Sequence, residues 1–195
     1  HAYRDWRNRL VLFDDVDISL PVERRQEGRP VVLQTVIRAA NRKTVRQIHT
    51  EIRDLQTKEL GDTQWGRWLR WYVMVPRFIR SLFLRVAQRV PTVLKRFNGT
   101  VLVTSVGMFG TIAGWGIPFP GHTLCVTIGG IEAKPVLQDG QLQNREHLRL
   151  TVTFDHDIVD GGPAARFTQR FASLVQTGAG LDGYGPAQRD TSAYP

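Results

Sequence analysis

The sequence predicts an α/β fold, in which strand segments and helical segments are built from one chain. Several stretches rich in Val, Leu and Ile have the composition and alternation of strands, beginning at residues 9–23 and 30–37. Other stretches place apolar residues at helical spacing, and these are residues 43–56, 77–90 and 163–177. A chain of 195 residues with 42% hydrophobic and 23% charged residues suits one well-buried domain, so we expect a single domain over residues 1–195.

The charge of the chain is concentrated in one segment. The formal net charge is +8, and residues 65–97 carry all of it, since they contain eight Arg and Lys and no Asp or Glu. The single cysteine, Cys125, excludes an internal disulfide and a metal site built on cysteines, which favours a reducing, cytoplasmic location. The chain opens on His1 instead of methionine, so we expect that a segment upstream has been removed.

The first half of the chain reads as two strands and a helix. Residues 9–23 and 30–37 have strand character, and "RRQEGRP" between them has the composition of a hairpin turn. In "KTVRQIHTEIRDLQ", residues 43–56, apolar side chains recur at helical spacing. Thr44 and Gln47 form the pattern of a capping box, in which two side chains satisfy free amides at the start of a helix.

Residues 62–97 form a basic insert. After Pro76, apolar and arginine side chains alternate as on an amphipathic helix, with Phe78, Ile79, Leu82, Phe83, Val86 and Val90 on the apolar side. Packing against the protein's own core is the preferred interpretation of that face. An anionic membrane surface and another subunit are the alternatives, and the tryptophans at 65, 68 and 71 suit an interfacial position.

From Thr100 onward the sequence is rich in strands. We expect a strand within residues 100–110, a Gly/Pro loop at 111–121, and a long strand region at 122–142 with a tight turn at "QDGQ". The last strand, residues 147–156, has an apolar face that ends in His156. A helix follows, with Pro163 in its first turn and Gly178 after its end, and residues 178–195 are expected to be loop.

From the residues alone, His156 is either a catalytic base or a structural histidine at a strand end. The alternation of the strand predicts that its ring faces the apolar layer, where partial burial favours the neutral form that a general base needs. The other histidines, His1, His49, His122 and His147, have no metal-ligand spacing, so we predict no metal site.

Several motifs then resemble one family. "TFDHDIVDGGPAARF" at 153–167 is similar to the His-x-x-x-Asp-Gly signature of the dihydrolipoyl acyltransferase component of 2-oxo acid dehydrogenase complexes, whose catalytic domain shares its fold with chloramphenicol acetyltransferase. "GTVLVTSVGMFG" at 99–110 resembles a second stretch of that domain, and the resemblance covers residues 8–60 and 98–177. It implies a two-layer sandwich, a mixed sheet with flanking helices.

The resemblance also implies an activity, coenzyme A-dependent transfer of an acyl group between a thioester and a dihydrolipoamide-like thiol. His156 would be the general base that deprotonates the thiol, and Thr104 would donate a hydrogen bond to the oxyanion. Ser105, next to Thr104, is the second choice for that donor. Asp160 would brace the loop of His156 through an arginine, which in relatives lies ahead of the start of this chain. Gly161 would allow a sharp passage from strand to helix. Ser105 and Gly161 are also the residues expected beside coenzyme A.

The partners implied by the resemblance are acyl-coenzyme A, a lipoylated group on a separate protein, and two further copies of the chain. In such a homotrimer, His156 of one chain meets Thr104 of its neighbour. No lipoyl domain, subunit-binding domain or swinging linker is recognised, so we expect a stand-alone catalytic domain.

Two departures from the family leave alternatives open. Asp157 follows His156 where the family has arginine, and a carboxylate there favours the protonated histidine and disfavours base catalysis. The insert at 62–97 replaces a shorter connection. The rival interpretation is a non-catalytic trimeric scaffold, or a degenerate acyltransferase at a membrane surface. Binding of nucleic acid by the basic segment is the less favoured third.

Overall fold

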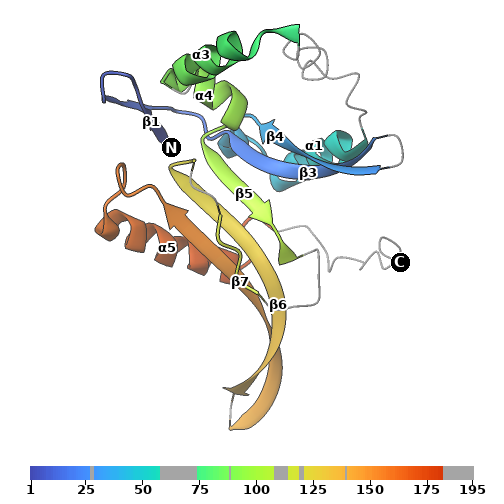
Figure 1. Cartoon of the computed structure of the whole chain (residues 1–195). Coiled ribbons are helices and arrows are strands. Elements are labelled where there is room, and N and C mark those ends of the chain that lie inside the picture. The colour runs from blue at the N-terminus through green and yellow to red at the C-terminus, as the bar shows by residue number, and fades with distance from the viewer. Residues whose placement is uncertain are drawn as a thin grey trace.

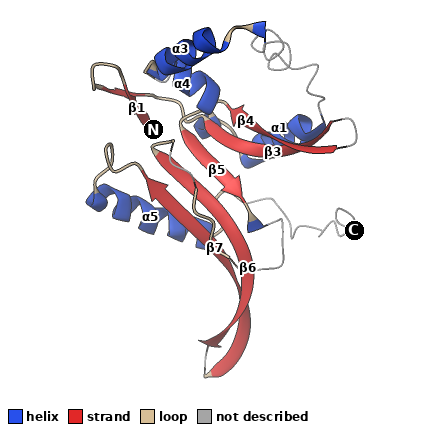
Figure 2. Cartoon of the chain, in the orientation of Figure 1, coloured by secondary structure: helices blue, strands red, loops and turns tan. Residues whose placement is uncertain are grey.

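The computed structural model describes residues 1–26, 29–57, 74–87, 89–107, 114–118, 121–138 and 140–181. Its main feature is a five-stranded sheet of order β4-β3-β5-β6-β7, shown in Figures 1 and 2. Strand β5 is parallel to both of its neighbours, whereas the β3–β4 and β6–β7 pairs are antiparallel. The mixed sheet expected for an α/β domain is therefore confirmed. The strands are β3 (Ile18–Gln26), β4 (Arg29–Ile37), β5 (Val101–Ser105), β6 (Leu124–Gln138) and β7 (Gln141–Phe154).

The prediction of one strand over residues 9–23 is wrong in its middle. Residues Leu10–Leu12 form β2, which pairs with β1 (Ala2–Arg4) in a separate small sheet, and β3 begins only at Ile18. Asp17 ends the break, because its buried carboxylate accepts hydrogen bonds from the Arg38 guanidinium and the Ala39 amide, each at 2.8 Å. These are tertiary contacts that alternation along the sequence does not report.

Two helices were predicted nearly to the residue. Helix α1 (Val45–Thr57) begins with the expected capping box, in which Gln47 Oε1 accepts from the Thr44 amide and Thr44 Oγ1 accepts from the Gln47 amide. Helix α5 (Gly161–Gln176) follows β7 and packs on it through Phe154 and Phe167, whose ring centroids are 5.7 Å apart. Both helices lie behind the sheet in the view of Figure 1. This arrangement is the two-layer one expected.

The connection between β6 and β7 is the tight hairpin that "QDGQ" predicts. Gln138 pairs with Gln141, and Gly140 has a φ of 78°, which glycine adopts without strain. At the start of β6, Cys125 is buried with its neighbour Val126, and these two join Val22, Ile37 and Val101 in the core of the sheet. The core therefore sits on the three central strands and β4.

The basic insert contains two short helices in its described part. Helix α3 (Arg77–Ala87) ends before the predicted Val90, and α4 (Pro91–Asn98) starts afresh with proline in its first turn. A 3-10 turn, η1, covers Ala40–Arg42. Among the described helices, none is long and apolar enough to cross a membrane. Residues 62–73 of the insert, the glycine-rich 108–113 and the tail from 182 lie outside the described residues.

Candidate active site

A pocket opens on the face of the sheet opposite α5. Its volume is about 490 Å³, within the range of small-molecule sites. Strand β5 contributes alternate residues to it, as its pleat requires, and Thr104 lies among them. Ser105, the second choice for the oxyanion donor, is not part of the lining, because neighbouring side chains of a strand point to opposite faces. Polar groups on the wall come from Gln34, Thr104, His122 and Thr127.

Thr104 has a second hydroxyl beside it. Thr127 on β6 is its partner in the parallel register, and both line the pocket. Thr127 is buried, and its Oγ1 has no hydrogen-bond partner among the residues that the structure describes. A Cβ placed on Gly116 would lie 2.4 Å from the Thr127 methyl group, so the loop at 114–118 closes tightly over this threonine. The pocket thus holds a buried hydroxyl that no described residue hydrogen-bonds.

His122 is a third polar group in the same pocket. Its Nε2 lies 2.7 Å from the carbonyl oxygen of Asn98, an acceptor that assigns the ring proton to Nε2. Burial lowers the pKa of His122, and the hydrogen bond to Asn98 opposes that effect in part. In the neutral ring, Nδ1 is then the acceptor nitrogen. Sequence reasoning placed His122 among the structural histidines. The only signal that could have suggested a pocket was its position between a Gly/Pro loop and the start of β6.

His156 lies on an exposed turn, and not in the apolar layer as the alternation of the strand predicted. Strand β7 ends at Phe154, and the Asp155 amide then donates to the carbonyl of Thr123. The Ile158 and Val159 amides both donate back to the Asp155 carbonyl, which turns the chain sharply. The period of two residues stops with the strand, so it could not place residue 156.

Thr104 and His156 of one chain are not brought together. Through the register, Thr104 lies beside Thr127 and Thr127 beside Thr151, and His156 is five residues farther along the chain. Two strand spacings and five residues correspond to a separation of about 15–20 Å. His156 is also absent from the lining of the pocket. The two predicted catalytic groups therefore cannot act on one substrate within a single chain.

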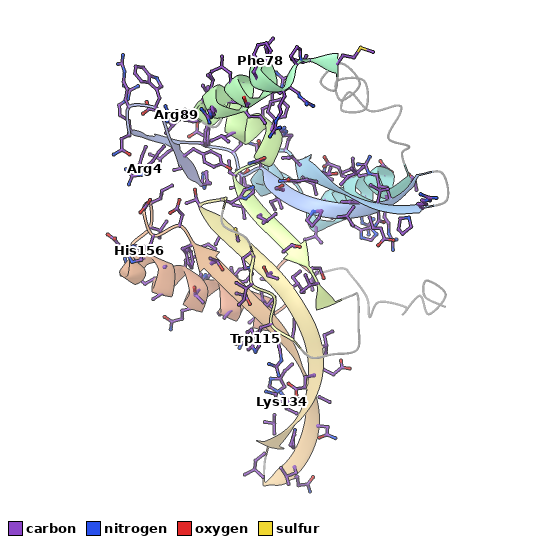
Figure 3. The ribbon with its side chains drawn as sticks, in the orientation of Figure 1. Arg4, Phe78, Arg89, Trp115, Lys134 and His156 are labelled. Carbon is purple, nitrogen blue, oxygen red and sulfur yellow. The ribbon has the colours of Figure 1, made fainter. Side chains whose placement is uncertain are left out.

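The turn that carries His156 is fixed from both sides. Arg4 donates a hydrogen bond from Nη2 to the carbonyl oxygen of Asp157, and the Asp157 amide donates to Asp155 Oδ1 at 3.0 Å. Figure 3 shows Arg4 above the turn of His156. Sequence reasoning missed Arg4, since nothing in the order of residues links the first strand to the last turn. Its place near the start of the chain was the only available signal.

The described residues show neither the ion pair expected of Asp160 nor the backbone angles that would require glycine at Gly161. Asp160 is the N-cap residue of α5, makes no side-chain cap bond and forms no ion pair with the residues that the structure describes. The prediction that Gly161 needs unusual backbone angles is wrong, because its φ is not positive and an added Cβ would meet nothing within 4 Å. The turn at 155–159 redirects the chain before Gly161, so α5 starts there with ordinary geometry.

Fold and pocket define an α/β domain of the chloramphenicol acetyltransferase type, with a substrate-sized cavity on its sheet. The solved structures that it resembles support this class. A probable dihydrolipoamide acetyltransferase from Listeria monocytogenes superposes with a TM-score of 0.58 at 20% identity, covering 99% of this chain and 65% of that one. The dihydrolipoamide acetyltransferase of Azotobacter vinelandii gives 0.54 at 22% identity, covering 89% and 59%.

Sequence comparison finds similarity to one family over part of the chain. Residues 87–181 match the family described as 2-oxoacid dehydrogenases acyltransferase (catalytic domain). The chain is therefore related to the acyltransferase catalytic domains of 2-oxo acid dehydrogenase complexes, as its motifs predicted. It is 30% identical over 79 residues, 40% of its length, to the succinyltransferase component of the 2-oxoglutarate dehydrogenase complex of Saccharomyces cerevisiae, and 33% over 84 residues, or 43%, to a lipoamide acyltransferase component from Pseudomonas putida. The chain covers 17% and 20% of these relatives.

Proposed function

We propose that this chain is the catalytic module of an acyltransferase, which moves an acyl group between coenzyme A and a thiol of the dihydrolipoamide kind. The observation that carries the proposal is the family match over residues 87–181, because this stretch contains both Thr104 and His156. Relatives named as dihydrolipoyllysine succinyltransferase and lipoamide acyltransferase support the choice of thiol. A lipoylated partner protein and a cytoplasmic location stay predictions.

In the proposed reaction, His156 removes the proton of the incoming thiol, and the thiolate sulfur attacks the carbonyl carbon of the thioester. The carbonyl oxygen becomes negative, and the Thr104 hydroxyl stabilises it by donating a hydrogen bond. When the carbonyl re-forms, the original carbon–sulfur bond breaks, and the departing thiolate takes the proton back from His156. One thioester and one thiol are consumed and one of each is formed, so no oxidant or reductant is needed.

The proposed assembly is a homotrimer with its sites between subunits. Two features of the single chain support it. Thr104 and His156 lie too far apart to share a substrate, and His156 is exposed on a turn that Arg4 holds in place. A neighbouring copy can bring its own His156 to the pocket of Thr104, and closed symmetry then completes every site in the same way.

The pocket suits the reacting end of a thioester. A volume of about 490 Å³ accommodates an acyl group and part of its thiol arm, and the apolar wall formed by Leu102, Val106 and Ile117 fits the acyl chain. At the polar side, the hydroxyls of Thr104 and Thr127 lie in neighbouring register positions. These groups are where a developing oxyanion would be stabilised.

The test is acyl transfer from a panel of acyl-coenzyme A donors to dihydrolipoamide. His156→Ala should lower kcat about 100- to 10,000-fold, the usual contribution of a general base. Thr104→Val should lower kcat about 100- to 1,000-fold, whereas Thr104→Ser keeps the hydroxyl and should retain most of the activity. His49→Ala, an exposed histidine on α1, is the matched control. Wild-type rates equal to those of His156→Ala would contradict the proposal.

A non-catalytic trimeric scaffold is the second candidate, and Asp157 is the observation that favours it. This residue follows His156 where the family has arginine, so the charge beside the proposed base is reversed. Asp157→Arg, which restores the residue of the family, distinguishes the two. A scaffold predicts no transfer by either protein, while the transferase predicts activity in the wild type and a changed pH profile in the variant.

A further inference from the structure

The feature that the proposed function does not use is the apolar face of α3. Viewed down the helix, Phe78, Leu82, Val86 and Ile79 follow one another around one side, over an arc of about 100°. At 11 residues the helix is about 16 Å long, so its stripe spans three turns. The pattern is that of a helix with one face meant to be covered.

Nothing in the described chain covers that face. None of the residues of α3 is buried, and Phe78 and Leu82 expose 72% and 63% of their surface. Figure 3 shows Phe78 on the outer side of α3, directed away from the sheet. On α1, by contrast, Ile48, Ile52 and Leu55 are half-buried, since that helix packs against β3. The interpretation of the α3 face as packing onto the protein's own core is therefore wrong for the described residues.

Positive charge borders the apolar face. Arg85 lies at one edge of the stripe, next to Phe78 around the helix, and Arg77 lies farther round on the same side. Arg89 follows beyond the end of the helix. Residues 74–98 contain six Arg and Lys and no Asp or Glu. Within the described ranges, Arg77, Arg85 and Arg89 have no carboxylate at ion-pair distance. Within the described residues, the surface thus combines an exposed apolar stripe with arginines that have no carboxylate at ion-pair distance.

We propose that α3 binds the surface of an anionic lipid bilayer. In this arrangement the helix lies parallel to the membrane, the stripe enters the boundary between headgroups and acyl chains, and the arginines contact lipid phosphates. A second copy of α3 is a poorer partner, because pairing the stripes would bring like charges together. Nucleic acid would pair with the arginines but leave the apolar stripe in water. Of these three partners, the bilayer surface is the one that contacts both the apolar stripe and the arginines.

The test is flotation of the full-length chain with vesicles of phosphatidylcholine, with or without phosphatidylglycerol. The wild type should float with the anionic vesicles, and binding should weaken as salt is raised, since ions screen the arginines. Leu82→Glu should reduce binding at least tenfold. Arg85→Gln should reduce it several-fold on anionic vesicles and hardly change it on neutral ones.

Leu142→Glu is the matched control. Leu142 is 75% exposed at the tip of the β6–β7 hairpin, so the substitution makes the same chemical change at an equally exposed site away from α3. It should bind vesicles as the wild type does, and circular dichroism should show both variants folded. Acyl transfer by Leu82→Glu without vesicles should be unchanged, which separates this proposal from the enzymatic one. Equal flotation of Leu82→Glu and wild type would overturn it, as would lipid-free self-association that Leu82→Glu abolishes.

Discussion

Two buried threonines, Thr123 and Thr127, differ in whether their hydroxyls are hydrogen-bonded. Thr123 donates its hydroxyl to the carbonyl of Ala2 and thereby joins β1 to the start of β6. Thr127, four residues later on β6, is as buried, but no described residue hydrogen-bonds its Oγ1. A buried hydroxyl without a partner is unfavourable for folding, so under the proposed function we expect the substrate to supply a partner for it.

Thr127→Val should therefore leave the free energy of unfolding unchanged or raise it by about 1 kcal/mol, since it removes a hydroxyl with no partner. Thr123→Val should lower it by about 1–3 kcal/mol, because the Ala2 carbonyl loses its donor. Urea unfolding of both variants measures the difference. We also expect Thr127→Val to slow acyl transfer, and full activity in that variant would show that its hydroxyl does not contact the substrate.

His122 gives the fold a dependence on acid. Burial lowers its pKa in the folded state below the ordinary value of 6.5, so the unfolded chain binds a proton more readily. The neutral ring stabilises the fold fully above pH 6.5, and this contribution is lost as the pH falls from 6.5 through the lower folded-state pKa. His122→Gln keeps a donor for Asn98 and should flatten the decline in unfolding free energy between about pH 7 and 5. His49→Gln, at an exposed site, should leave the slope as in the wild type.

At the scale of elements, the sequence predicted the features that depend on residues close together along the chain, such as helix caps and turns. The capping box at Thr44 and the Asp-Gly turn before Gln141 follow from local hydrogen bonding, and both formed as expected. The break before β3 did not, because it depends on Asp17 meeting Arg38 and Ala39. The exposure of α3 could not be predicted either, because apolar residues at helical spacing form the same pattern whether a core or a membrane covers them.

The candidate site also combines residues that a local motif indicates with residues that only the folded structure brings together. A motif selected Thr104 and His156 as candidates, and of these two the structure places Thr104 in the pocket, which is assembled from separate segments of the chain. Its wall includes Pro21 and Gln34, which face each other across β3 and β4, together with residues near 98, 117 and 122. The spacing of residues along the sequence does not predict that these distant segments line one pocket. His122 and the unpartnered hydroxyl of Thr127 could be recognised only once the strands were in register.

At the scale of the whole molecule, a site divided between copies predicts complementation. His156→Ala and Thr104→Val should each be inactive alone. Mixed and refolded in equal amounts, they should recover activity at about a quarter of the interfaces, where an intact His156 meets an intact Thr104 from the other variant. Activity measured on the mixed oligomer, separated by size, tests this. A protein carrying both substitutions, mixed with Thr104→Val, should recover nothing. Activity that stays absent in the first mixture would place both groups in one subunit.

The outer part of the β6–β7 hairpin has a consequence for how the protein avoids unwanted association. Strand β5 pairs with β6 as far as Ile128, and from Ile131 onward the described partner of β6 is β7. A bare strand margin of this kind can recruit strands from other molecules into growing aggregates. Here a lysine, Lys134, and a proline, Pro135, which has no amide proton to offer, stand side by side on that margin. Both residues disfavour the addition of a further strand there, so we expect this part of the hairpin to extend into solvent without recruiting other chains.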